Sequence, residues 1–134
     1  MMRESWLPAA PESALLARTM VREAAVEQGL DGDCMWDLML ATTEAVANAI
    51  KHGKPCQDGG RGILVRVQPW GGADGLCVEV CDCGTFEANT RPAAHDATHG
   101  RGIPIIAAVV DHFELLPDGP LTRVRFAKRK ALAA

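Results

Sequence analysis

An acidic residue and a glycine close the apolar segment "VEVCDCG", residues 78–84. The alternating apolar residues predict a strand, which places Asp82 at the end of a sheet and Gly84 just beyond it. The Asp82 carboxylate can accept a hydrogen bond from an exocyclic amine, and a flat ring can approach the backbone at Gly84, which has no Cβ atom. The pair therefore fits recognition of an aminated ring, although Asp and Gly also favour an ordinary turn.

Two glycines, Gly100 and Gly102, precede the apolar segment "IPIIAAVVD", residues 103–111. Pro104 suits the first turn of a helix there, because its missing N–H would have no partner in any case. Glycines before a helix N-terminus leave free N–H groups and the positive end of the helix dipole for an anion. The segment predicts an anion contact, with a flexible loop as the alternative. Neither the Walker spacing nor the Rossmann spacing of glycines occurs in the sequence.

The segment "TTEAVANAIKHG", residues 42–53, carries Glu44, Asn48 and His52 at four-residue intervals. Residues four apart lie one turn apart on a helix, so Glu44 and Asn48 are neighbours on one flank. We expect the core to be contacted by an adjacent stripe of Met39, Leu40, Thr43, Val46, Ala47 and Ile50. The small residues Ala41, Ala45 and Ala49 would let another body approach the backbone near this flank. A solvated flank of an alanine-rich helix fits the same residues.

Helical and extended patterns alternate along the rest of the chain. We expect strands at 3–9, 63–70, 76–82, 112–119 and 121–129, and helical segments at 11–28, 31–53 and 103–111. Gly29 would stop the first helix, and Asp31 or Asp33 would cap the second. Val124 and Phe126 would point inward from the last strand. With 134 residues the chain suits one domain, residues 1–134, of α+β class: a two-layer sandwich with a mixed, mostly antiparallel sheet and helices on one face.

Composition argues against several classes of protein. The formal charge of -3 and the aromatic content of 4% argue against nucleic-acid binding, which needs basic and stacking side chains. No apolar run reaches the roughly 18 residues of a membrane span, and the N-terminus lacks the apolar stretch of a signal peptide. We therefore expect a cytoplasmic protein that binds neither membrane nor nucleic acid directly.

The cysteines are five in number, without the paired C-x-x-C spacing of a structural zinc site. They are Cys34, Cys56, Cys77, Cys81 and Cys83. The last three alternate along one predicted strand and so share a face. We expect reduced core thiols, with a metal or redox site as the alternative.

The order of the motifs resembles the GHKL ATPase superfamily. The order is Glu-x-x-x-Asn followed by His-Gly, then Asp-x-Gly after a strand, Gly-x-Gly before a helix, and a threonine on the last strand. Within the superfamily the chain is similar to the anti-sigma-factor serine kinases, bacterial switch proteins, from "ESALLARTMVREAA" to "TRVRFAKR". The resemblance implies the two-layer GHKL (Bergerat) fold and the cofactors ATP and Mg²⁺.

Five positions take site roles from this resemblance. It implies that Asn48 holds Mg²⁺ and that Glu44 is the general base that deprotonates the attacking hydroxyl. It implies that Asp82 accepts from the adenine amine and that Gly84 borders the ring. Thr122 matches the threonine near the adenine.

The resemblance also assigns the phosphate end of the site. Gly100 and Gly102 would let the loop and the helix N-terminus meet the phosphates, and Arg101 would add charge. His52 and Gly53 match the end of the first motif, where a structural histidine is favoured over a catalytic one. The segment 85–99, which corresponds to the nucleotide lid, is short.

Arg18 falls where members of the family present an arginine to partner proteins, although a solvated helical charge fits it equally. The partners implied are an anti-anti-sigma antagonist protein and a sigma factor. A homodimer is also implied, through the N-terminal strand and the first helix.

Three functions remain open from the sequence. The first is a protein serine/threonine kinase that phosphorylates a small antagonist and sequesters a partner. The second is a non-catalytic ATP-binding module, which would not need the base Glu44. The third is the catalytic domain of a sensor histidine kinase, which is disfavoured because no phospho-acceptor hairpin precedes the domain in this sequence.

Overall fold

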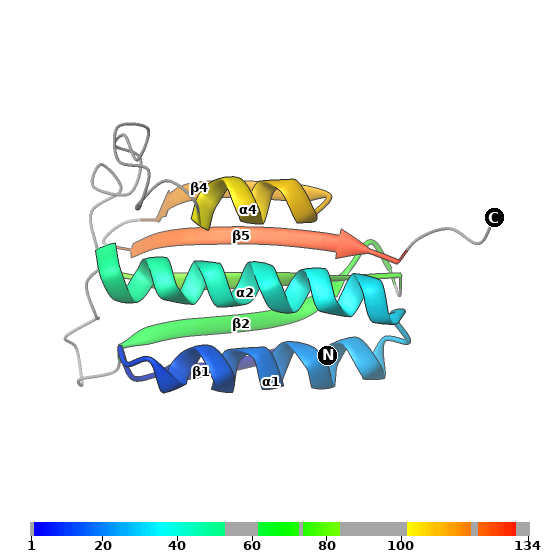
Figure 1. Ribbon diagram of the computed structural model, residues 1–134, viewed down its shortest axis with the longest axis horizontal. Coiled ribbons are helices and arrows are strands. Elements are labelled where there is room, and N and C mark those ends of the chain that lie inside the picture. Colours follow the sequence, from blue (N-terminus) through cyan, green and yellow to red (C-terminus); the bar gives the residue numbers. More distant parts are fainter. Residues whose placement is uncertain (1, 53–61, 73, 84–101, 119–120, 131–134) are drawn as a thin grey trace.

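The computed structural model describes residues 2–52, 62–72, 74–83, 102–118 and 121–130, which form a two-layer α+β sandwich (Figure 1). The elements follow one another as β1 (Arg3–Leu7), α1 (Glu12–Glu27), α2 (Gly32–His52), β2 (Ile63–Trp70), β3 (Gly75–Asp82), α4 (Gly102–Val109), β4 (His112–Asp118) and β5 (Leu121–Arg129). The strand order is β1-β2-β3-β5-β4, and each described pair is antiparallel. The helices cover one face of this sheet, so the predicted fold class is confirmed.

The ends of the two long helices follow from local sequence signals. Gly29, at a φ of 72°, follows α1 in the left-handed conformation that glycine adopts without cost. The N–H of Leu30 then donates to the carbonyl of Ala25 at 3.0 Å, which satisfies one of the last carbonyls of the helix. At the start of α2, the side chain of Asp31 accepts from the N–H of Cys34 at 2.7 Å. Of the two predicted caps, the structure therefore selects Asp31.

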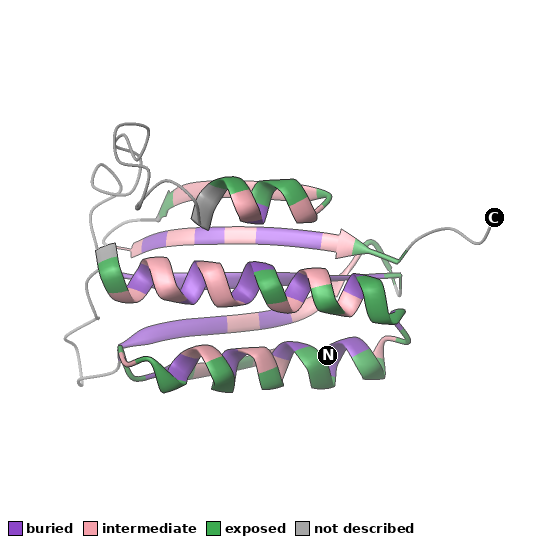
Figure 2. Ribbon diagram, viewed as in Figure 1, coloured by how far each residue is buried: buried purple, intermediate pink, exposed green. Residues whose placement is uncertain are grey.

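The core face of α2 differs from the predicted stripe. The buried residues around this face are Cys34, Leu38, Ala41, Thr42, Ala45, Val46 and Ala49. Leu40, which we expected in the core, is 37% exposed, and Met39 and Ile50 are only partly buried beside it. Three of the residues on this face are alanines, which add little to an apolar pattern, so a stripe drawn through the large apolar residues is displaced to one side. Figure 2 shows this narrow buried strip along α2.

The two faces of the sheet carry different side chains. Val65, Val78 and Phe126 belong to the core between sheet and helices. Their strand neighbours point to the opposite face because successive side chains alternate. As predicted, Val124 and Phe126 are buried, with exposed fractions of 8% and 0%.

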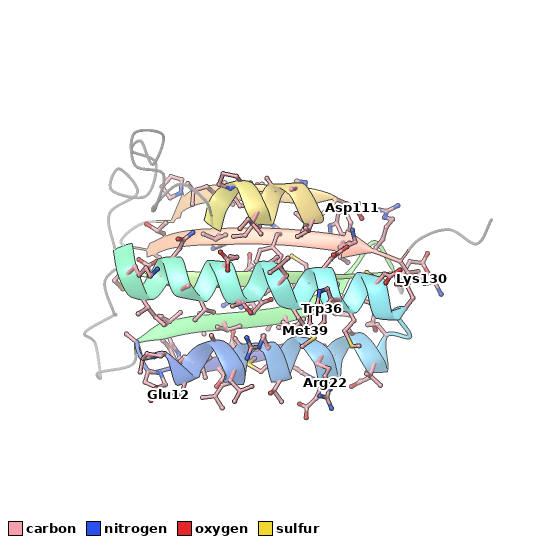
Figure 3. The ribbon with its side chains drawn as sticks, in the orientation of Figure 1. Glu12, Arg22, Trp36, Met39, Asp111 and Lys130 are labelled. Carbon is pink, nitrogen blue, oxygen red and sulfur yellow. The ribbon has the colours of Figure 1, made fainter. Side chains whose placement is uncertain are left out.

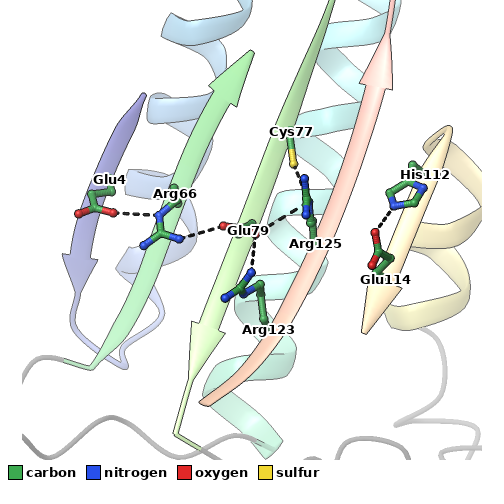
Figure 4. A network of polar contacts seen from close by, with 8 residues as sticks. All are labelled: Glu4, Arg66, Cys77, Glu79, His112, Glu114, Arg123 and Arg125. Atoms are coloured by element: carbon green, nitrogen blue, oxygen red, sulfur yellow. Dashed lines mark hydrogen bonds and ion pairs between the residues drawn. The ribbon is translucent and has the colours of Figure 1, made fainter. Parts of the chain in front are cut away.

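A charged network covers that opposite face (Figure 4). At its centre is Glu79 of β3, only 3% exposed. Its carboxylate accepts from Arg66 of β2 at 3.2 Å and from Arg123 of β5 at 3.3 Å, and Arg125 lies 3.9 Å away. Arg66 also donates to Glu4 of β1 at 2.9 Å. A buried carboxylate is costly unless it is paired, so this network makes Glu79 acceptable there.

The described cysteines are either thiols or disulfide-bonded. Cys34, Cys77 and Cys81 are buried thiols outside any disulfide, as predicted. Cys83 is disulfide-bonded, so the expectation of reduced thiols is wrong for this residue. Cys77 accepts a hydrogen bond from Arg125 Nε at 3.4 Å, on the same face as Glu79.

Gly62 is a position where a side chain should not be tolerated. Its φ is 83°, and a Cβ atom there would lie 2.2 Å from the carbonyl oxygen of Leu7. We expect Gly62→Ala to lower the free energy of unfolding by about 3 kcal/mol, measured by urea denaturation. Gly72→Ala is the matched control, because φ is 80° with no atom within 4 Å of the added Cβ, and its cost should be about 1 kcal/mol. Equal losses for the two variants would contradict the role of the Leu7 contact.

Cys34 should be unreactive although it lies in the first turn of a helix, where thiol pKa values are usually lowered. Burial, with Asp31 nearby, raises the pKa of Cys34 from 9.0 to about 11. At pH 8 its thiolate fraction is then about a hundredfold smaller than that of an ordinary thiol. We expect iodoacetamide to leave Cys34 unmodified in the folded protein at pH 8 and to label it in urea, as read by peptide mass spectrometry. Rapid labelling of the folded protein would contradict this environment.

Candidate functional site

Four elements bring their predicted site residues to one end of the sandwich. In Figure 1, the C-terminal end of α2, the end of β3, the beginning of β5 and the beginning of α4 lie at the same end. Antiparallel pairing explains this for the two strands, since the last residue of β3 lies opposite the first residues of β5. The predicted residues, far apart in sequence, are thus placed on neighbouring elements.

Asp82 and Thr122 form a directly opposed pair at this end of the sheet. Asp82 lies two residues after Val80 and Thr122 two residues before Val124, and residues two apart on a strand share a face. Because both valines are in the core, Asp82 and Thr122 also point to the face that the helices cover. Their exposed fractions are 4% and 1%, which is unusual for polar side chains in a core. Buried polar groups mark positions where a specific hydrogen-bonding role offsets the cost of desolvation.

The flank of α2 that carries Glu44 and Asn48 faces α4 and β5. Asp37 lies seven residues before Glu44 and therefore on the same flank. Its Oδ2 is 3.2 Å from Lys128 Nζ of β5, and the same ammonium donates to the carbonyl of Val109 in α4 at 2.9 Å. Glu44 and Asn48 are half-buried, so they lie at the margin between helix and solvent.

The other flank of α2 faces α1. Arg18 Nη1 of α1 donates to Thr43 Oγ1 of α2 at 3.3 Å, and Arg18 is half-buried. Arg18 therefore lies in the contact between two helices and not among the residues at the end of the sandwich. Its predicted role in partner binding stays a prediction.

Helix α4 begins at Gly102, as the glycine pattern predicts, with Pro104 in its first turn. Ile106 anchors the helix with an exposed fraction of 0%. Its N-terminus lies at the end of the sandwich where α2 ends.

Several predicted residues lie outside the described part of the chain. They are Gly53, Gly84, Gly100 and Arg101, together with the predicted lid, residues 85–99. His52 is the last residue of α2, and its side chain is not among those described.

Sequence reasoning missed Asp37 and Lys128. The signal for Asp37 was its seven-residue distance from Glu44, which places both acids on one helix flank. Lys128 gave no signal, because its contacts to α2 and α4 depend on tertiary packing.

Comparison with known proteins identifies the family. The profile of the histidine kinase-like ATPase domain matches residues 7–128. The chain therefore belongs to the histidine kinase-like ATPase family, and the GHKL resemblance is confirmed.

Individual relatives show which members of this family the chain resembles. The chain is 36% identical over 86 residues to the serine-protein kinase RsbW of Listeria monocytogenes serotypes 4a and 4b; the match covers 63% of this chain and 53% of the relative. The chain thus spans about half the length of the curated relatives it matches. It also superposes on the crystal structure of the RsbU and RsbW domains of Rv1364c from Mycobacterium tuberculosis with a TM-score of 0.73 and 23% identity, covering 96% of this chain and 32% of that one. This likeness shows the shared fold.

Two kinds of feature are absent from the described residues. Within them, no group of three or more His, Cys, Asp or Glu side chains is arranged to hold a metal ion. Among the helices of the same residues, none has the length and apolar content to cross a membrane.

Proposed function

We propose that the chain is an ATP-dependent protein serine/threonine kinase that acts as an anti-sigma factor or partner-switch regulator. The observation that carries this proposal is the position of Glu44 and Asn48, on the α2 flank that faces α4 and β5. The buried Asp82 and Thr122 lie at the same end of the sandwich. Membership of the ATPase family and similarity to the serine-protein kinase RsbW support the kinase assignment.

The adenine would bind at the sheet end of the site. The Asp82 carboxylate would accept a hydrogen bond from a ligand N–H, and adenine offers an exocyclic amine. Thr122, opposite Asp82, would line the same pocket, and Gly84 would let the ring approach the chain. Guanine carries a carbonyl where adenine carries this amine, so this arrangement would select ATP over GTP.

The phosphates would lie between α2 and the beginning of α4. Gly102 starts α4, whose N-terminal N–H groups and dipole favour a phosphate. Gly100 and Arg101 would extend this contact.

The residues present fit Mg²⁺, since this ion prefers oxygen ligands and is usually held by one or two side chains together with phosphates. The half-buried Asn48 would supply its amide oxygen. Bound Mg²⁺ would neutralise charge on the phosphates.

Glu44 would be the catalytic base. It lies one helical turn from Asn48, so its carboxylate oxygens face the same region. There it would accept the proton of the serine or threonine hydroxyl of the partner protein while Asn48 holds the nucleotide end in place.

The proposed partners are an anti-anti-sigma antagonist, as the phosphorylated protein, and a sigma factor, in the bacterial cytoplasm. The outer surface of the helices supports a protein contact, because Leu15 of α1 and Trp36 of α2 are 58% and 68% exposed. Arg18 would contribute to partner binding, and β1 with α1 would form the homodimer contact.

Glu44→Gln tests the catalytic role. The amide is nearly isosteric but cannot take a proton, so phosphate transfer from labelled ATP to an anti-anti-sigma protein of the same genome should fall about a hundredfold or more. ATP affinity, measured by calorimetry, should stay unchanged. Asp33→Asn, an exposed acid at the other end of α2, is the control and should transfer at the original rate. Transfer by Glu44→Gln at the original rate would refute the base assignment. ATP binding by the unchanged protein without any transfer would instead indicate a non-catalytic ATP-binding module.

Asp82→Asn tests adenine recognition. Calorimetric titration of the unchanged protein should show Mg²⁺-dependent binding of ATP and no comparable binding of GTP. In Asp82→Asn, ATP affinity should fall roughly tenfold to a hundredfold, because a buried charge-assisted hydrogen bond is weakened. Asp74→Asn, in the exposed turn between β2 and β3, should bind ATP normally. If Asp82→Asn binds ATP with the affinity of the unchanged protein, Asp82 does not recognise the adenine.

A further inference from the structure

Lys128 ties three elements together at the end of the sandwich opposite the proposed nucleotide site. Its Nζ donates to the carbonyl of Val109, the last residue of α4, at 2.9 Å. The same atom is 3.2 Å from Asp37 Oδ2 of α2. The Lys128 and Asp37 side chains are 22% and 32% exposed, so the contact is partly shielded from water. One ammonium therefore links β5 to the C-terminus of α4 and to α2.

Two hydrogen bonds of Asp111 reinforce the same junction. The N–H of Asp111, just after α4, donates to the carbonyl of Ala127 at 2.9 Å. The Asp111 carboxylate accepts from the N–H of Arg129 at 2.9 Å. Figure 3 shows Asp111 and Lys130 at this end of the molecule, where α4 and β5 both finish. The chain is thus held against β5 at Val109 and at Asp111 as it leaves α4.

Among the described side chains of α4, few are buried. Pro104, Ala107 and Ala108 are exposed, and Ile106 is the one fully buried side chain described in this helix. The helix has eight residues and is about 12 Å long. A short helix with so small a buried face needs polar contacts to fix its direction, and a cation at the C-terminus is well placed because it also meets the negative end of the helix dipole.

We propose that Lys128 is a positioning residue that fixes the direction of α4 and so sets the affinity for the phosphates of ATP. This inference rests on the proposed function, in which the N-terminus of α4 meets the phosphates. Lys128 acts through the helix, because the length of α4 separates its ammonium from that N-terminus. The adenine end, at Asp82 on β3, is independent of α4. Loss of the contact therefore weakens phosphate binding and leaves adenine binding intact.

Lys128→Met tests this, because methionine keeps the apolar stem and removes the ammonium. Calorimetry with Mg²⁺-ATP and with adenosine separates the two ends of the ligand. We expect the Kd of ATP to rise roughly threefold to tenfold, and the Kd of adenosine to stay within about twofold. Lys128→Arg, which can still donate to both the carboxylate and the carbonyl, should restore ATP binding.

Two further variants complete the experiment. Lys130→Met removes a neighbouring exposed charge of the same sign and should leave ATP affinity unchanged. Asp37→Asn weakens the contact from the α2 side and should also weaken ATP binding selectively. If Lys128→Met does not fold, the ATP affinity of Asp37→Asn tests the positioning role instead.

The outcomes distinguish failure of the positioning role of Lys128 from failure of the proposed function. If the unchanged protein binds ATP and the folded Lys128→Met and Asp37→Asn variants bind it equally well, the positioning role is overturned while the proposed function stands. Equal losses for ATP and adenosine would also overturn it, since they indicate general destabilisation. If the unchanged protein binds neither ATP nor adenosine, the proposed function fails and the positioning role fails with it.

Discussion

The close contact between α2 and the sheet is the constraint on which the other contacts depend. Ala41, Ala45 and Ala49 lie in the buried strip of this helix beside Leu38 and Val46, and the alanine side chains end at Cβ. A helix with such a strip can lie closer to the strands than one with leucines at the same positions. From this position α2 contacts α1 on one flank, through Thr43, and β5 and α4 on the other, through the contact of Asp37 with Lys128.

Local signals explain why much of the fold is predictable from sequence. The order of helices and strands follows from periodicity, and the break between α1 and α2 follows from Gly29 and Asp31, whose effects reach only a few residues along the chain. The placement of Asp82 at the end of a strand is also local, because it ends an apolar run. Its position opposite Thr122 follows once β3 and β5 pair.

Features that depend on tertiary packing were not predictable in this way. The buried face of α2 was placed too far toward Leu40, because alanine contributes little to an apolar pattern even where it is fully buried. In the sequence Lys128 is one of several basic residues near the C-terminus, which gives no sign of its contacts. In the structure its ammonium connects β5 to α2 and α4. Glu79 lies in a strand of apolar residues, and only the register of β2 and β5 brings arginines to it.

The Glu79 network also depends on the register of the strands. Because side chains alternate along a strand, a shift of one residue would turn Arg66, Arg123 and Arg125 toward the helices and Val65 and Val124 toward water. Such a misaligned sheet would bury guanidinium groups in the apolar core. It would also leave the Glu79 carboxylate without its arginine partners. The network spans β1, β2, β3 and β5, so it penalises misalignment in each of these strands. The face that carries no helix therefore favours a single register of the sheet.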